Sequence, residues 1–368
     1  MQITVLCKVV DNFGDIGVVY RLSKQLKKIN PQNQINLVTD NLSSFQKICS
    51  AVKTELPFQS VEDLNIYDWN AADFCHEAFL RDDGIRMQVI LECFQCGRPD
   101  WMERILFEEK LNRTVHIIMI DYLTAEKYAE DFHCLQSLTR SAKVQKVNFM
   151  PGFTEKTGGL VIDDEWKEVP VWKSEGPVLV FTYERNWNSL VEGVMSLQKS
   201  SRELKFLVAQ GRGKKSFMNA VKACGAENFV EELPYLNQTE WDKMMKGCSA
   251  LVIRGEESMS RACLSGIPFI WHAYPQSEEY QLVKVKALLE RMRRHFTTAD
   301  FEIVEKAWLE INSPDGGTDR GKKINFYADF FSALPRLVSA FQDFAGSLRK
   351  NGDLAYNLMT YIKKLDII

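Results

Sequence analysis

Histidine is scarce in this chain of 368 residues, which contains five, and its nine cysteines are an odd number at irregular spacings. A disulfide framework uses paired cysteines, so this pattern indicates reduced thiols, as in a cytoplasm. Cys93 and Cys96 form one CxxC motif, but no second pair follows at zinc-ribbon spacing and no histidine stands at ligand spacing. Because one pair cannot complete a tetrahedral zinc site, we predict no metal site.

The chain also lacks an excess of positive charge and any long hydrophobic run. It has 46 basic and 49 acidic residues and a formal net charge of −3, so no nucleic-acid partner is expected. The mean hydropathy is −0.23, and no apolar run approaches the ~20 residues that span a bilayer. The first residues read as a strand rather than a signal peptide, so we expect a cytoplasmic protein without a membrane partner.

The length suits two domains, because a single hydrophobic core rarely grows beyond about 250–300 residues. Short apolar runs alternate with stretches in which apolar residues recur every three or four positions. This alternation is typical of α/β proteins with doubly wound parallel sheets. Strands are predicted at 3–10, 35–39, 87–93, 115–122 and 147–149, and again at 178–181, 204–209, 229–233, 250–253 and 268–272.

An acidic segment with two prolines, residues 163–177, interrupts this alternation. We therefore predict an N-terminal Rossmann-like domain at 1–165, a linker at 166–177 and a C-terminal Rossmann-like domain at 178–348. Two such domains facing across a cleft form the architecture of B-type (GT-B) glycosyltransferases. Residues 349–368 are predicted to contain a helix capped by Asp353. We favour packing of this helix on the N-terminal domain, although packing on the second domain fits the pattern as well.

Two carboxylates stand close together directly after the first predicted strand, in the motif Asp11-Asn12-Phe13-Gly14-Asp15-Ile16-Gly17. In doubly wound sheets ligands bind beyond the carboxyl ends of the strands, where glycine lets the backbone approach them. The motif is not GxGxxG, so a dinucleotide cofactor is not expected here. Either both carboxylates face a ligand, or one of them only caps the helix expected to begin near Gly17.

A second motif, Arg254-Gly255-Glu256-Glu257-Ser258, lies between a predicted strand and a predicted helix that Gly266 ends. The free N–H groups and the dipole of a helix N-terminus favour a diphosphate. Arg254 can add a charge-assisted contact to phosphate. Acidic residues at a helix start are also ordinary capping residues, so this plainer interpretation stays open.

Aromatic and amide side chains follow two other predicted strands of the second half. Phe181 and Tyr183 come at the end of one strand, and Tyr235 and Gln238 follow another. An aromatic face and an amide are suitable partners for a nucleobase. Because aromatic residues near strand ends are often core residues, each of these positions is a weak signal by itself.

These motifs, in this order, resemble those of the bacterial protein-arginine rhamnosyltransferases that modify elongation factor P, the EarP family. The resemblance rests on DNFGDIG at 11–17, FMPGFTEKTGGL at 149–160, FTYE at 181–184, RGEES at 254–258 and PFIWHAYPQ at 268–276. The segments ECFQC at 92–96 and DYL at 121–123 add to it, and together they cover most of the chain.

The resemblance implies an inverting glycosyltransferase that moves L-rhamnose from dTDP-β-L-rhamnose to an arginine of elongation factor P, with no cofactor and no metal. It implies that the N-terminal domain receives the protein acceptor and that the C-terminal domain binds the nucleotide sugar. The family's essential acids fall on Asp11, Asp15 and Glu256. Its donor contacts fall on Asn12, Phe13, Gly14, Phe181, Tyr183, Tyr235, Gln238, Arg254, Gly255, Glu257 and Ser258. Glu257 stands where the family commonly has aspartate.

The chemistry of arginine agrees with a site that has two carboxylates. A guanidinium has a pKa above ~12 and delocalised lone pairs, so it is a poor nucleophile. One carboxylate can accept its proton while another orients it. We predict that Asp15 is the base, that Asp11 orients the arginine or holds the loop, and that Glu256 anchors Arg254 or its loop.

Two other functions fit the same sequence. The chain can be a GT-B glycosyltransferase with another nucleotide sugar or a small-molecule acceptor, which titration with different nucleotide sugars distinguishes. It can also be a catalytically inactive module that binds elongation factor P. The mass of the factor after incubation with the donor separates the enzyme from the inactive module.

Overall fold

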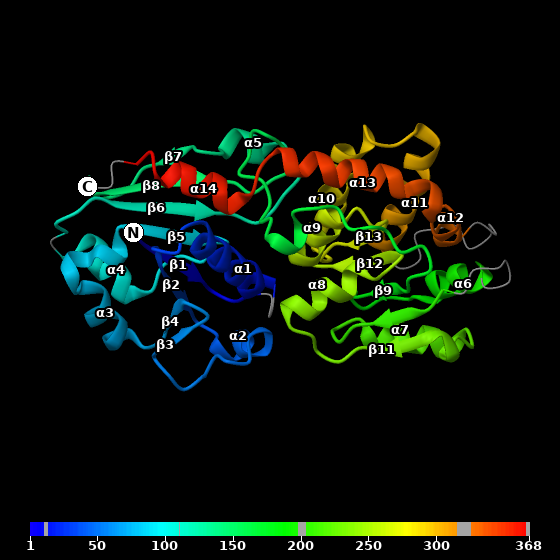
Figure 1. Ribbon diagram of the computed structural model, residues 1–368, viewed down its shortest axis with the longest axis horizontal. Helices are drawn as coiled ribbons and strands as arrows, with labels where there is room; N and C mark the ends of the chain where they lie inside the picture. Colours follow the sequence, from blue (N-terminus) through cyan, green and yellow to red (C-terminus); the bar gives the residue numbers. More distant parts are fainter. Residues whose placement is uncertain (11–13, 110, 198–203, 315–324, 366–368) are drawn as a thin grey trace. The chain divides into compact units, whose positions relative to one another are not determined.

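The computed structural model describes residues 1–10, 14–109, 111–197, 204–314 and 325–365 (Figure 1). The chain divides into two compact units, which we call unit 1 (Met1–Asp164 with Lys350–Ile368) and unit 2 (Glu165–Arg349). It therefore passes between the units twice, at a first crossing after Asp164 and a second crossing after Arg349. Among the described residues, no helix has both the length and the apolar character needed to traverse a membrane.

Unit 1 is built on an eight-stranded sheet with the order β3-β4-β2-β1-β5-β6-β8-β7. Its inner strands pair in parallel, and the two edge strands pair antiparallel to their neighbours. The strands are β1 (Gln2–Cys7), β2 (Gln34–Thr39), β3 (Phe58–Val61), β4 (Leu64–Asp68), β5 (Val89–Cys93), β6 (Val115–Ile120), β7 (Gln136–Ser137) and β8 (Val144–Phe149). The helices are α1 (Gly14–Ile29), α2 (Leu42–Ile48), α3 (Ala72–Leu80), η1 (Asp82–Met87), α4 (Asp100–Phe107), α5 (Tyr128–Phe132) and α14 (Leu354–Ile362).

All five strands predicted for the first half are confirmed, within three residues at each end. Most are buried runs of apolar residues, as expected for a parallel sheet covered on both faces, whereas β8 also carries the exposed Gln145 and the half-buried Lys146 and Asn148. The sequence analysis missed β3, β4 and β7, which are short and contain polar residues. The turn between β3 and β4 also carries no Asn-Gly or Asp-Gly signal, because Glu62 and Asp63 occupy its positive-φ positions.

The last described helix of the chain, α14, belongs to unit 1. Asp353 caps it by accepting a hydrogen bond from the Tyr356 N–H at 3.2 Å. Its apolar side chains Leu354, Leu358 and Ile362 are buried in the same core as the strands and α1. In Figure 1 the helix, coloured red, lies along the strands β6 and β8.

Unit 2 has a five-stranded, all-parallel sheet with the order β11-β10-β9-β12-β13. The strands are β9 (Val178–Val180), β10 (Phe206–Val208), β11 (Val230–Glu232), β12 (Ala250–Arg254) and β13 (Phe269–His272), and all five lie where the sequence predicts them. The helices are η2 (Asp164–Trp166), α6 (Asn188–Leu197), α7 (Lys214–Ala223), η4 (Glu227–Phe229), α8 (Gln238–Lys246), α9 (Glu256–Ser265), η5 (Ser277–Glu279), α10 (Tyr280–Arg293), α11 (Thr298–Asn312), α12 (Phe326–Ser332) and α13 (Leu334–Lys350). Residues 166–177, predicted as a linker, are part of this unit.

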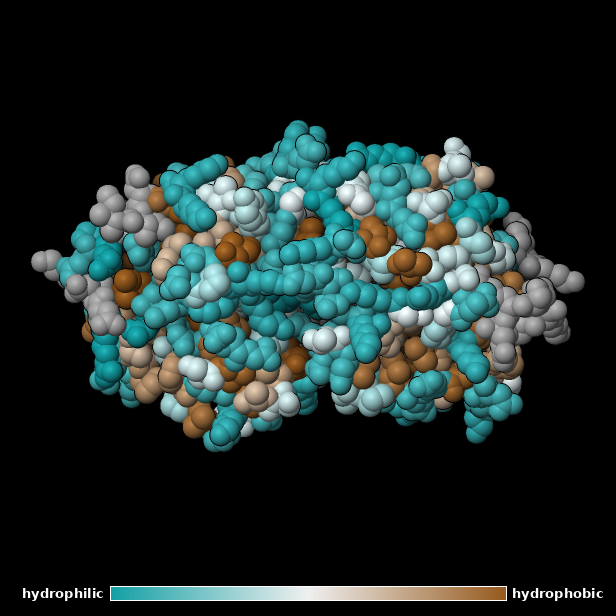
Figure 2. Space-filling view, viewed as in Figure 1, coloured by the Kyte–Doolittle hydropathy of each residue, from teal (hydrophilic) through white to brown (hydrophobic). Residues whose placement is uncertain are grey.

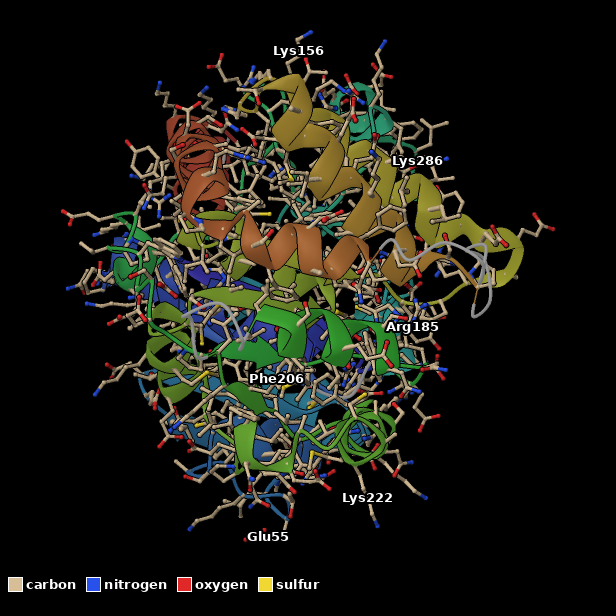
Figure 3. All side chains as sticks on the ribbon, turned by 90° about the vertical axis from the view of Figure 1, so that its right-hand side faces the viewer. Glu55, Lys156, Arg185, Phe206, Lys222 and Lys286 are labelled. Carbon is tan, nitrogen blue, oxygen red and sulfur yellow. The ribbon has the colours of Figure 1, made fainter. Side chains whose placement is uncertain are left out.

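Side chains separate between interior and surface as the hydrophobic effect requires. Phe206 of β10 is fully buried inside unit 2, whereas Lys222 near the end of α7 points outward (Figure 3). Hydrophilic residues cover most of the face shown in Figure 2, and apolar residues are scattered among them. The two sheets are thus buried scaffolds that position the residues following their strands.

Candidate functional site

The candidate site of unit 2 lies at the carboxyl edge of its sheet, where the strand order changes direction. The chain places β10 and β11 on one side of β9, and β12 and β13 on the other. In doubly wound sheets ligands bind at such a switch point, outside the carboxyl ends of the strands. The residues that follow β9 and β12 are therefore neighbours, although more than 70 positions separate them in the sequence.

Arg254, the last residue of β12, lies over two aromatic rings that follow β9. Its guanidinium carbon is 4.4 Å from the centroid of the Phe181 ring and 4.7 Å from that of the Tyr183 ring. Its Nε is buried and has no hydrogen-bond partner in the described part of the chain. A cation that is held by rings and is not neutralised by a carboxylate keeps its N–H groups available to an anion.

Gly255 and α9 extend this cationic site with backbone donors. Gly255 has φ 74° and ψ 157°, a conformation that essentially only glycine adopts, and it leads directly into α9. The first helical hydrogen bond runs from the Met259 N–H to the Gly255 carbonyl at 3.1 Å. The N–H groups of Glu256, Glu257 and Ser258 therefore precede the hydrogen-bonded ladder of the helix. Together with the dipole they favour an anionic ligand.

The acidic side chains of the same motif turn to basic partners in unit 2. Glu256 Oε1 is 3.7 Å from Lys284 Nζ of α10. Glu257 Oε1 is 3.6 Å from the Nε of the buried Arg261, one turn along α9. The side chain of Glu257 thus reaches along its own helix. That Glu256 anchors Arg254 or its loop stays a prediction: the Glu256 carboxylate lies near Lys284, and Arg254 lies over the aromatic rings.

His272, at the end of β13, supports the ring cluster, and the sequence analysis missed it as a candidate. Its buried Nδ1 accepts a hydrogen bond from the Tyr183 N–H at 3.3 Å, and its ring contacts Tyr183 and Trp187 edge-on. Burial, and then the nearby cations Arg185 and Arg254, lower the pKa of His272 to about 3. A neutral imidazole therefore fixes the backbone that carries Tyr183. Its position at a strand end on this edge was the available signal.

The structure places the other predicted donor contacts of unit 2, Gln238, Tyr235 and Ser258, in three different surroundings. Gln238 is the first residue of α8, and Trp241 of the same helix meets the Phe181 ring edge-on at 5.2 Å between centroids. That contact brings α8 to the same edge of the sheet. Tyr235 lies in the connection before α8 and is 70% exposed. Ser258 is buried in the first turn of α9.

The candidate site of unit 1 lies after β1, which is also a switch point, since β2 and β5 flank it. Asp15 is 4% exposed, and its Oδ2 accepts a hydrogen bond from the Val10 N–H at 2.8 Å. Helix α1 begins at Gly14 rather than near Gly17, and Asp15 lies in its first turn. The dipole of α1 stabilises a carboxylate there. Asp11, Asn12 and Phe13 lie outside the described residues.

The CxxC motif lies beside Asp15 but has the properties of buried structural thiols. Burial raises the pKa of Cys93, and Cys96 and Asp15 are among the smaller causes. Burial likewise raises the pKa of Cys96 to about 12. Thiols with raised pKa values are poor nucleophiles and poor metal ligands. No group of three or more His, Cys, Asp or Glu side chains in the described residues could hold a metal ion.

The chain matches known proteins along almost its whole length. The family model described as "Elongation-Factor P (EF-P) rhamnosyltransferase EarP" matches residues 3–363. A protein-arginine rhamnosyltransferase of Shewanella oneidensis is 28% identical, with 98% of this chain and 97% of that protein covered. A protein of the same name from Pseudomonas aeruginosa is 28% identical over 85% of this chain and 87% of its own length.

The fold agrees with the sequence relationship. A solved structure reported as the "structural basis for EarP-mediated arginine glycosylation of translation elongation factor EF-P" matches with a TM-score of 0.60 and 17% identity, and 99% of each chain is covered. The predicted architecture of two doubly wound units, that of the GT-B glycosyltransferases, is thus confirmed as a fold. With the family model covering residues 3–363, this chain belongs to the EarP family of elongation factor P rhamnosyltransferases.

Proposed function

We propose that this protein transfers L-rhamnose from dTDP-β-L-rhamnose to an arginine guanidinium of elongation factor P, with inversion at the anomeric carbon and without a metal. Family membership supports the reaction, since relatives along the whole chain are protein-arginine rhamnosyltransferases. In this proposal unit 2 binds the nucleotide sugar, unit 1 receives the protein acceptor, and the reaction takes place in the cytoplasm.

The observation that carries the donor assignment is Arg254. Its guanidinium rests on Phe181 and Tyr183 at the start of α9, and its buried Nε lacks a hydrogen-bond partner among the described residues. A diphosphate is an anion with several acceptor oxygens, so it can accept from Arg254 and from the N–H groups of α9 together. These donors can stabilise the negative charge that develops on dTDP as it leaves.

The proposed chemistry uses the carboxylate of Asp15 on the acceptor side. One guanidinium nitrogen attacks the anomeric carbon, the bond from that carbon to the diphosphate oxygen breaks, and the carbon–nitrogen bond forms on the opposite face. The proton lost by the nitrogen passes to Asp15. The products are rhamnosylarginine and dTDP, which leaves with the electron pair of the broken bond. Asp11 orients the arginine. Tyr235 and Gln238 contact the thymine base of the donor.

One incubation tests the proposal. Purified elongation factor P is mixed with the full chain and dTDP-β-L-rhamnose, and its intact mass is measured before and after. A gain of one deoxyhexose on an arginine is expected. An unchanged mass of elongation factor P would contradict the transfer reaction and favour the inactive binding module. Parallel reactions with UDP- and GDP-sugars determine whether another nucleotide sugar replaces the donor.

A further inference from the structure

The C-terminal end of helix α9 packs against residues that follow the first crossing. Gly266, which ends the helix with φ 65°, packs so closely that a Cβ there would lie 2.8 Å from Cγ1 of Val169 and 3.0 Å from Cα of Gln342. All residues of α9 from Ser258 to Ser265 are buried. A buried helix with no room at its end cannot shift unless the segments around it shift as well.

Arg349, the last residue of unit 2, fastens this end of α9. Its Nη2 donates to the Leu264 carbonyl at 2.7 Å and to the Glu168 carbonyl at 3.0 Å. Its Nε donates to the Trp166 and Lys167 carbonyls at 3.1 and 3.0 Å. One guanidinium thus joins the second crossing, the first crossing and the C-terminal end of α9. Only the five donors of arginine can make such a connection.

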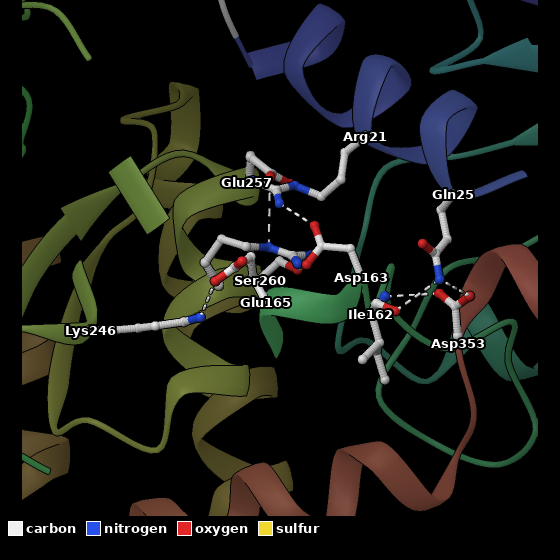
Figure 4. Close-up of polar contacts among 10 residues, drawn as sticks. Arg21, Gln25, Ile162, Asp163, Glu165, Lys246, Glu257, Ser260 and Asp353 are labelled. Atoms are coloured by element: carbon white, nitrogen blue, oxygen red, sulfur yellow. Dashed lines mark hydrogen bonds and ion pairs between the residues drawn. The ribbon is translucent and has the colours of Figure 1, made fainter. Parts of the chain in front are cut away.

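The equivalent helix of unit 1 is fastened to the same two crossings (Figure 4). Arg21 of α1 forms an ion pair with Asp163. Gln25 of α1 donates to the Ile162 carbonyl at 3.1 Å and to Asp353 Oδ2 at 3.2 Å. Asp353 Oδ1 in turn accepts from the Ile162 N–H at 2.8 Å. Helix α1, which has Asp15 in its first turn, is therefore tied to residues just before the first crossing and to Asp353 just after the second.

We propose that Arg349 is a positioning residue for the transfer reaction. By tying α9 to the first crossing, it makes the position of the phosphate-binding N-terminus of α9 depend on the crossing that also holds α1. Binding of the donor at the N-terminus of α9 is therefore expected to slow hydrogen exchange at the first crossing as well. This inference rests on the proposed function for its kinetic readout, whereas its structural readout needs only dTDP.

Hydrogen exchange of the full chain with dTDP as the probe tests the structural part. In the wild type, dTDP slows exchange at the start of α9 and also at residues 162–169. In Arg349→Lys, which keeps the charge but has too few donors for all these carbonyls, protection at the start of α9 remains and protection at 162–169 is lost. Arg336→Lys is the matched control on α13, because the Nε of Arg336 contacts Asp300 at the surface. This control should behave as the wild type.

Steady-state kinetics test the catalytic part. We expect kcat of Arg349→Lys to fall roughly 10-fold or more, because small misplacements of bound groups cost about that much, while dTDP affinity stays within about twofold. Retained kcat with retained protection at 162–169 overturns the proposal. A joint loss of kcat, dTDP affinity and thermal stability also overturns it, since a purely structural role predicts that pattern. If Arg349→Lys fails to fold, Arg349→Gln replaces it, because its neutral amide avoids a buried charge and still has too few donors for all these carbonyls.

The two proposals fail in different ways. Absence of rhamnose transfer by the wild type removes the proposed function, while the dTDP-dependent exchange at 162–169 still decides the role of Arg349. Transfer by the wild type without any effect of dTDP on that exchange removes the positioning role alone.

Discussion

The guanidinium carbon of Arg254 lies 4.4 Å from the centroid of the Phe181 ring, so the last residue of β12 is stacked on the first residue after β9. This contact places a cation at the switch point of the sheet of unit 2, and its buried Nε has no hydrogen-bond partner among the residues that the structure describes. In the proposed function, the ring holds the guanidinium and the charge favours an anionic ligand.

Arg254→Lys tests the contribution of the guanidinium to donor binding. Lysine keeps the charge, but it loses the planar stacking on Phe181 and Tyr183 and the bidentate geometry toward phosphate. We expect the dissociation constant for dTDP to rise about 10-fold, which corresponds to roughly 1.4 kcal/mol. Isothermal titration calorimetry measures it, with Arg336→Lys as the surface control. An unchanged affinity would remove Arg254 from the donor site.

Gly255→Ala tests the backbone that leads into α9. A Cβ at Gly255 meets no atom within 4 Å, so the cost comes from φ 74° and ψ 157° rather than from a clash. We expect a loss of about 1–3 kcal/mol in the free energy of unfolding. Gly346→Ala is the control, because a Cβ there also meets nothing within 4 Å but the residue lies inside α13. It should stabilise the protein by about 0.5–1 kcal/mol in urea denaturation.

Asp15→Asn tests the proposed base. The amide keeps an oxygen acceptor for the Val10 N–H but cannot accept the arginine proton, so kcat should fall at least ~10²-fold while dTDP binding is retained. Asp40→Asn is the matched control, since Asp40 Oδ1 accepts from the neighbouring Val9 N–H at 2.8 Å. Rates are measured from the mass of the modified acceptor. Comparable activity in the two variants would show that Asp15 only closes the loop.

His272 gives a pH dependence of stability. Its pKa is about 3 in the folded protein and 6.5 when exposed, so the unfolded chain binds more protons between these values. The contribution of neutral His272 to the free energy of unfolding is therefore fully present above pH 6.5, and it is lost as the pH decreases toward 3. The amide oxygen of His272→Gln can still accept from the Tyr183 N–H. In this variant the free energy of unfolding should depend less strongly on pH, because unfolding takes up as much as one proton fewer. Melting temperatures between about pH 7 and pH 4 measure this.

Asp353→Ala tests how α14 is held in unit 1. The side chain caps α14 and also bonds to the Ile162 N–H and to Gln25, so its loss removes three partners. We expect a cost of about 2–4 kcal/mol. Asn237→Ala removes a cap and its exposed capping box from α8 alone and should cost about 1 kcal/mol. If both variants lost the same free energy of unfolding in urea, the bonds from Asp353 to Ile162 and Gln25 would contribute nothing.

Strands and helix ends could be predicted because short stretches of sequence determine them. The apolar run 115–120 favours a buried strand, and Gly266 and Asp353 end or begin helices through their own backbone and side-chain chemistry. The early start of α1 was missed because Asp15 makes its bond backwards, to Val10, outside any helical pattern.

The sequence by itself determined the two parallel sheets, the edges at which their strands end, and the motifs that identify the family. Only the tertiary structure decided that Arg254 rests on Phe181, that a neutral His272 supports Tyr183, and that Arg349 joins both crossings to α9. The physical reason is range. Strand and helix signals act over a few residues, whereas these contacts join positions brought together by the strand order and by the second crossing of the chain.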